Sequence, residues 1–62
     1  MVDSKEFHQR LTEALSKKKN LTVRMIAHEF GASFPTVERW MSGENYPHEA
    51  LRDLVLKFVE GV

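Results

Sequence analysis

The chain of 62 residues contains no cysteine, which removes two common ways of stabilising a small protein. Without thiols it forms neither a disulfide framework nor a zinc site with cysteine ligands. A core built from so short a chain supplies only about 3–5 kcal/mol of net stability. We therefore expect one domain over 1–62 that is stabilised by side-chain packing, and association with a second subunit would add to that stability.

Long hydrophobic runs are also missing. No apolar segment approaches the roughly 18 residues that a membrane span needs. The first residues include Asp3, Lys5 and Glu6, whereas a secretory signal carries a basic stretch followed by an apolar one. The sequence predicts a cytoplasmic protein with no membrane partner.

The chain has no excess charge of either sign, because nine basic residues balance nine acidic ones. This neutrality argues against indiscriminate nucleic-acid binding, which usually goes with a strong excess of Lys and Arg. Specific binding stays open, because phosphate responds to the local potential and a basic face can coexist with an acidic opposite face.

Patterns typical of metal sites and catalysis are lacking as well. His28-Glu29 and His48-Glu49 begin like a zinc-protease motif, but no second histidine follows four residues later. No Ser, His and Asp arrangement lies on a glycine-rich turn, and so small a domain has little room for a cleft. We expect that the protein is not an enzyme and that it binds no metal, no cofactor and no small-molecule ligand.

What the chain does contain is apolar spacing typical of helices. The spacing predicts four helices, at about 4–17, 23–30, 34–42 and 48–60. Alternation of apolar and polar residues with a period of two, which would indicate strands, is absent beyond a few residues. The predicted fold is all-α, a compact four-helix domain.

Capping residues support these helix boundaries. Ser, Thr and Asp side chains accept hydrogen bonds from the first free backbone amides of a helix, and glycine takes the left-handed conformation that often follows a helix end. The residues expected in these roles are Asp3, Thr22 and Ser33 at N-termini, and Gly31 and Gly43 at C-termini.

The second and third predicted helices are joined by a three-residue turn that begins with Gly31. Two helices joined so tightly cross at about 90–120°. Ala27 is small enough to permit close crossing, and Gly31 allows the chain to turn. Apolar residues fill the wedge between the helices, namely Ile26, Phe30, Ala32, Val37 and Trp40. The arrangement is typical of a helix-turn-helix.

The same stretch closely resembles the lambda-repressor-like, Cro-type helix-turn-helix family, and the similarity extends over about 4–60. The matching residues are Leu21-Thr22, Ile26-Ala27, Gly31-Ala32-Ser33, Pro35-Thr36-Val37, Arg39-Trp40, Ser42-Gly43 and Pro47. Family members often carry a polar residue where this chain has Phe34. The resemblance implies a phage- or prophage-type transcriptional regulator or repressor that binds double-stranded operator DNA.

In such a protein the third helix reads base edges in the major groove. Arg39 suits a bidentate contact to guanine, Phe34 suits a thymine methyl group, and Glu38 suits the cytosine amino group. The expected base-contacting residues are Phe34, Pro35, Thr36, Glu38 and Arg39. Two alternatives stay open: Phe34 contacts another protein or packs partially, and Arg39 forms a surface ion pair with Glu38 or Glu44.

Phosphate contacts are expected on both sides of the reading helix. The N-terminus of the second helix offers free amides and a favourable dipole. The expected phosphate-contacting residues are Thr22, Arg24, Ser33, Ser42, Asn45 and Lys19. The lysine run 17–19 either extends this line of contacts or forms a solvated loop.

The last helix is expected to provide a dimer interface. Its main apolar stripe contains Leu54 and Val55, and Leu56 falls outside it. We expect Leu56, Val59 and Val62 to form the interface of a homodimer on a near-palindromic operator, with two reading helices about one DNA turn apart. Isolated surface apolar residues are also common without such a role. The alternative function is a protein-interaction module that docks a partner through Phe34, Leu56 and acidic faces.

Overall fold

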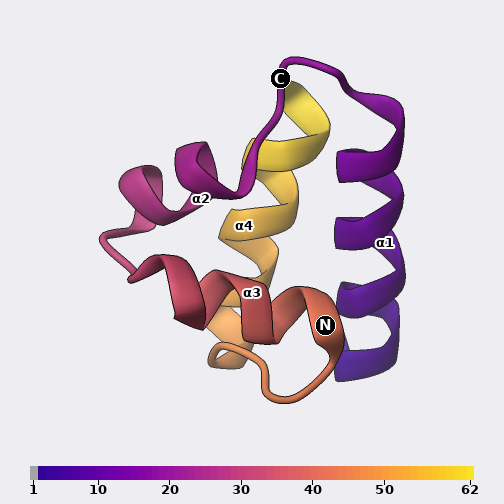
Figure 1. Cartoon of the computed structure of the whole chain (residues 1–62). Coiled ribbons are helices and arrows are strands. Elements are labelled where there is room, and N and C mark those ends of the chain that lie inside the picture. The colour runs from indigo at the N-terminus through magenta and orange to yellow at the C-terminus, as the bar shows by residue number, and fades with distance from the viewer. Residues whose placement is uncertain (1) are drawn as a thin grey trace.

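The computed structural model describes residues 2–62, and over this range it contains four helices and no strand (Figure 1). The helices are α1 Ser4–Lys17, α2 Val23–Phe30, α3 Phe34–Ser42 and α4 Glu49–Gly61. The all-α prediction is confirmed. The last helix begins and ends one residue later than predicted. Its start is set by the His48 cap, whose Nδ1 atom accepts from the Ala50 amide at 3.3 Å.

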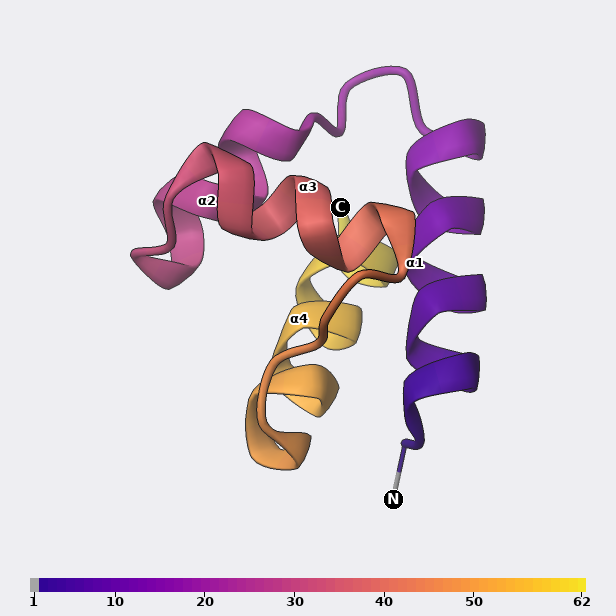
Figure 2. The same ribbon diagram turned by 60° about the horizontal axis from the view of Figure 1, so that its bottom comes forward.

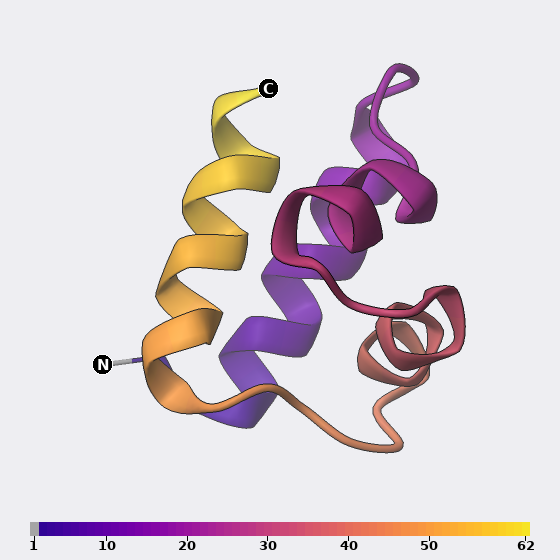
Figure 3. The ribbon, with the colours of Figure 1, turned by 90° about the vertical axis from the view of Figure 1, so that its left-hand side faces the viewer.

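The helices form two pairs. α1 and α4 pack against each other, and α2 and α3 pack against each other (Figures 1 and 3). The second pair contacts the first, α3 through α1 and α2 through α4. Figure 2 shows the loop after α3 passing from the end of α3 to the start of α4. None of the helices within 2–62 has both the length and the apolar character that a membrane span requires.

All five predicted caps are present. Asp3, Thr22 and Ser33 each accept a hydrogen bond from the backbone amide three residues later, at 2.7, 3.2 and 3.3 Å. Gly31 and Gly43 end α2 and α3 in the left-handed conformation, with φ angles of 63° and 82°. Because caps satisfy backbone groups that have no partner inside the helix, they set where each helix begins and ends.

All four helices contribute to a single apolar core. Its largest fully buried side chains are Phe7, Leu11, Ile26, Val37, Val55, Leu56 and Val59. The Phe7 ring meets Trp40 and Tyr46 edge-on, with centroids 6.2 and 6.0 Å apart. These contacts fasten α3 and the following loop to α1.

The position of Leu56 corrects a prediction. Leu56 is 1 % exposed and Val59 is 0 % exposed, whereas Leu54 is 56 % exposed. Two helices, α1 and α2, pack against α4, so its buried stripe is wide enough to include Leu56 and lies on the side away from Leu54. Leu56 and Val59 belong to the core of one chain, and their expected place in a dimer interface is wrong. Val62 is exposed as expected.

Arg10 of α1 and Lys18, which follows α1, hold the end of α4. The Arg10 guanidinium donates two hydrogen bonds to the Glu60 carboxylate, at 2.8 and 2.5 Å. Lys18 Nζ donates to the carbonyl oxygens of Val59 and Glu60, at 2.8 and 2.7 Å. These carbonyls carry the negative end of the helix dipole, which a cation stabilises. The C-terminal turn of α4 is thereby held against α1.

Candidate nucleic-acid interface

The two sides of α3 differ sharply in exposure. Val37 and Trp40 are buried at 0 % and 4 % exposure, as predicted, and Met41 is half-buried beside them. The residues on the opposite side are exposed to solvent, namely Phe34, Pro35, Glu38, Arg39 and Ser42. α3 is therefore anchored by one face and presents the other.

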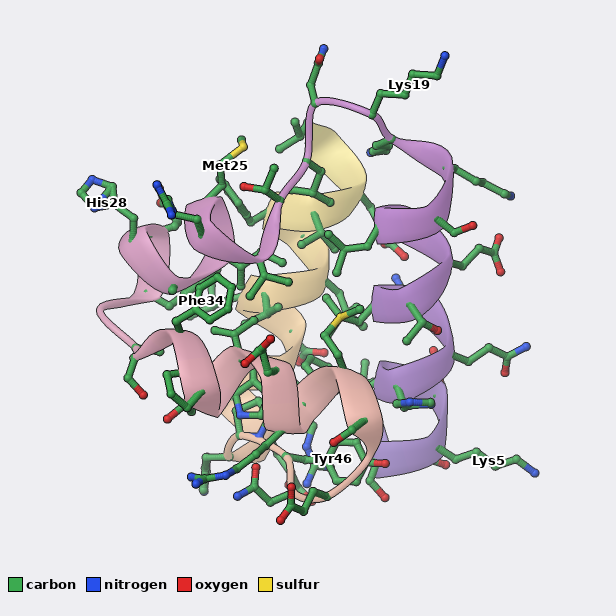
Figure 4. The ribbon with its side chains drawn as sticks, viewed as in Figure 1. Lys5, Lys19, Met25, His28, Phe34 and Tyr46 are labelled. Atoms are coloured by element: carbon green, nitrogen blue, oxygen red, sulfur yellow. The ribbon has the colours of Figure 1, made fainter. Side chains whose placement is uncertain are left out.

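The first turn of α3 is largely apolar on its outer side. The Phe34 side chain is 45 % exposed and lies between α2 and α3 in Figure 4. The neighbouring Pro35 is exposed as well. The hydroxyls of Ser33 and Thr36 bond each other at 2.7 Å, and the Ser33 hydroxyl also accepts from the Thr36 amide. Thr36 is half-buried, so it is less accessible than its sequence position suggests.

The second half of α3 is polar. A shallow hollow of about 420 Å³ lies along it, lined by Pro35, Glu38, Arg39, Ser42 and Glu44. None of the salt bridges found within 2–62 involves Arg39, so its expected alternative, an ion pair with Glu38 or Glu44, does not form. The Ser42 hydroxyl donates to the Arg39 carbonyl at 3.2 Å. The guanidinium of Arg39 is thus available to a ligand.

Five of the six residues expected to contact phosphate fall into two groups. Thr22 and Arg24 are exposed at the start of α2, and Lys19 projects from the preceding turn in Figure 4. Ser42 and Asn45 are exposed at the other end, where α3 leads into its loop. The first group therefore lies at the start of α2, and the second where α3 ends. Ser33 lies apart from both groups, at the first turn of α3.

The lysine run 17–19 does not act as one unit. Lys17 pairs with Glu13 at 2.8 Å, and Lys18 holds the end of α4. Across the described chain, Lys19 is the member of the run with no side-chain hydrogen bond or ion pair. The three lysines thus differ in their contacts, and the run is neither a continuous basic line nor a wholly solvated loop.

Two residues that position α3 were missed by sequence reasoning. The His8 Nε2 atom lies 2.7 Å from the carbonyl oxygen of Met41. Because a carbonyl only accepts, Nε2 carries the proton. The Tyr46 ring meets His8 edge-on, with centroids 6.4 Å apart. His8 borders the apolar stripe of α1, three residues before Leu11, and this spacing is the signal that indicates an inward role.

Over the range 2–62, no three His, Asp or Glu side chains gather into a set that could hold a metal ion. Comparisons with models of known protein families, with curated proteins and with solved structures found no match to this chain.

Proposed function

We propose that this chain is a sequence-specific regulator that binds double-stranded DNA, with α2 and α3 as a helix-turn-helix of the lambda-repressor-like type. In this proposal α3 lies in the major groove, which is wide enough for one α-helix. The observation that carries the proposal is the pair of faces on α3. Val37 and Trp40 fix the helix from beneath, while the opposite face is open and carries an unpaired Arg39.

The short connection between α2 and α3 supports this assignment. Gly31 turns the chain in the left-handed conformation, and the Ala32 amide donates to the Ala27 carbonyl at 2.9 Å. Ala27 itself is 8 % exposed, and a larger side chain there would separate the two helices. The tight turn gives α3 a fixed orientation on α2, which a helix needs if it is to meet base edges in one register.

Two charged residues on the outer side of α3 suit direct reading of bases. Arg39 has the donors for a bidentate contact to guanine, and Glu38 can accept from the cytosine amino group. Both line the shallow hollow along α3. Neither side chain makes a salt bridge in the described chain, so no protein contact has to break before DNA binds.

The flanks of α3 supply the phosphate contacts of this proposal. Lys19, Thr22 and Arg24 lie on the α2 side, and the amides at the start of α2 favour an anion. Ser42 and Asn45 lie on the other side and are neutral. With few cations in contact, we expect the affinity to depend on salt less steeply than it does for strongly basic DNA-binding proteins.

A homodimer on a near-palindromic site is part of the proposal, with a changed interface. Since Leu56 and Val59 lie in the core, α4 offers exposed Leu54 and Val62 instead. Asp53 and Lys57 flank Leu54 and are exposed. In an isologous contact these residues of one chain would face the same surface of its partner.

The burial of Leu56 also weakens the alternative function, a protein-interaction module. Leu56 is buried and offers nothing to a partner. Phe34 and the exposed acidic residues after α3 remain for such a role. The unpaired Arg39 on an open helix face favours DNA.

Selection of duplexes from a random library, followed by titration of the best sequence at several salt concentrations, tests the proposal. We expect enrichment of one motif, and a logarithm of affinity that falls linearly with the logarithm of salt concentration. A symmetric motif indicates two copies on the DNA, and a single half-site indicates one. Failure to enrich any sequence would overturn the proposal and return the chain to the protein-interaction alternative.

A further inference from the structure

We propose that the first turn of α3 recognises the C5-methyl group of a pyrimidine, so that the chain binds a site carrying thymine or 5-methylcytosine at one position better than the same site carrying uracil or unmethylated cytosine. This inference rests on the proposed function and names the chemistry that part of the site reads. It makes cytosine methylation a signal to which the protein responds.

The first observation is the placement of Phe34. Of the three exposed large hydrophobic residues in the described chain, Leu54 and Val62 lie on α4 or at its end, and only Phe34 lies on α3. Phe34 takes part in none of the aromatic pairs found within 2–62. An aromatic side chain that is 45 % exposed at the leading turn of a groove-binding helix has apolar surface available for a ligand.

The second observation is that the polar groups of this turn are largely occupied. The Ser33 and Thr36 hydroxyls bond each other at 2.7 Å, and the Ser33 hydroxyl also accepts from the Thr36 amide at 3.3 Å. This internal bonding leaves one hydroxyl proton for a base. Pro35 has no amide proton at all. The turn therefore presents mainly the Phe34 and Pro35 rings.

The major groove offers one apolar group to such a surface. Each base pair presents hydrogen-bonding atoms there, and the thymine pair adds the C5-methyl group. In 5-methylcytosine the same carbon carries the same methyl group, so an apolar contact does not distinguish the two bases. A polar residue in place of Phe34 would favour a hydrogen-bonding edge instead. The apolar first turn of α3 matches the methyl group.

The spacing along α3 places this contact relative to the polar one. Phe34 and Arg39 are five residues apart, which is about 7.5 Å along an α-helix axis at about 1.5 Å per residue. DNA rises about 3.4 Å per base pair. If α3 follows the groove, the methyl-bearing pyrimidine lies about two base pairs from the guanine that Arg39 contacts.

The test uses the duplex obtained by selection and changes one base at a time. Each thymine is replaced by uracil, each cytosine by 5-methylcytosine, and each thymine–adenine pair in turn by a cytosine–guanine pair with and without the C5-methyl group. The Kd of every duplex is measured for the wild-type chain, for Phe34→Ala and for Gln9→Ala. Gln9→Ala is the control, because it also truncates an exposed side chain to Cβ, but on α1, outside the candidate interface and the proposed dimer contact. Thermal unfolding of all three proteins checks that each is folded.

For the wild-type chain we expect one position at which loss of the methyl group raises the Kd about fourfold, the effect of burying a single methyl group. At that position a 5-methylcytosine should bind more tightly than cytosine by a similar factor. In Phe34→Ala the ratio should fall to about one, and in Gln9→Ala it should stay at the wild-type value.

The inference is overturned if the wild-type chain binds uracil and thymine equally at every position, or if Phe34→Ala keeps the wild-type ratio. A duplex that binds tightly but is insensitive to methyl groups removes this inference and leaves the proposed function standing. If no duplex is enriched in the selection, both fail together, and a protein partner becomes the candidate ligand of Phe34.

Discussion

At the residue scale, the outer side of α3 is divided between two chemistries. Its first turn carries Phe34 and Pro35, and its second half carries Glu38 and Arg39. Arg39, like Arg24, makes no side-chain hydrogen bond or salt bridge within 2–62, whereas Arg10 is held by Glu6 and Glu60 and Arg52 donates to backbone carbonyls. The contacts of an arginine side chain thus distinguish one that stabilises the fold from one that is available to a ligand.

Arg39→Ala should weaken binding to the selected duplex by about 1–3 kcal/mol and relax the preference at one base pair, because a bidentate contact to guanine is lost. Titration of the preferred duplex and of single-base variants measures both effects. Lys5→Ala is the control, since this substitution also removes one positive charge. Lys5 projects from α1 away from α3 (Figure 4). Equal weakening on all sequences would make Arg39 a phosphate contact instead.

At the element scale, α3 is held in place both by caps from its own segment and by contacts from other parts of the chain. Ser33 and Gly43 cap it through the local chain. His8 on α1 bonds the Met41 carbonyl near the end of α3, at 2.7 Å. Tyr46 packs on His8 from the following loop. The orientation of α3 thus depends both on its own sequence and on α1.

Substitution of the two cap glycines by alanine should have unequal costs. Both take positive φ angles, of 63° at Gly31 and 82° at Gly43, so each alanine costs about 1–2 kcal/mol of folding free energy from backbone strain. A Cβ atom at Gly31 meets open space, whereas one at Gly43 would lie 3.1 Å from the Tyr46 hydroxyl. We expect Gly43→Ala to be the more destabilising change in urea unfolding.

The difference in folding free energy cost between Gly43→Ala and Gly31→Ala should shrink when Tyr46→Phe is combined with Gly43→Ala. Removal of the Tyr46 hydroxyl relieves its close approach to the added Cβ atom. Tyr46→Phe alone is the control for loss of the hydroxyl itself. Equal costs for Gly31→Ala and Gly43→Ala in the wild-type background would contradict this account of the loop.

At the scale of the whole molecule, the first and last helices are joined by an ion pair. α1 and α4 pack side by side, and Arg10 joins them through Glu60. The hydrogen bond from Arg10 lowers the pKa of Glu60 below its ordinary value of 4.5, against a smaller opposing effect of burial. Equal numbers of acidic and basic residues overall are compatible with this pairing and with the separate cations beside α2.

Stability should fall in acid partly because of Glu60. A carboxyl group whose pKa is lower in the folded state stabilises the fold above its unfolded-state pKa, and the contribution is lost as the pH falls through the folded-state pKa. Glu60→Gln should therefore flatten the pH dependence of the unfolding free energy below about pH 5. The effect should stay under about 1 kcal/mol, because the pair is exposed to solvent.

Thermal unfolding over a series of pH values measures this dependence. Glu29→Gln removes an exposed carboxylate that makes no salt bridge within the described chain and serves as the control. If the unfolding free energy of Glu60→Gln falls with decreasing pH as steeply as that of the wild-type chain, the Arg10–Glu60 pair contributes nothing to stability.

The sequence by itself determined the number of helices, their boundaries to within one residue and five of their caps, but not the His48 cap of α4. These features depend on neighbours a few residues away, such as Thr22 and the amide of Met25. It also determined which side of α3 is buried, because a single stripe with Val37 and Trp40 is readable from spacing. Most of the candidate interface was predictable for that reason.

Only the tertiary structure decided how distant segments use their side chains. Leu56 is buried and Leu54 exposed because two helices cover α4, which the spacing within one helix cannot reveal. Lys18 reaches carbonyls 41 and 42 residues away, and His8 reaches one 33 residues away. Such contacts depend on the packing of whole helices, so no local pattern specifies them.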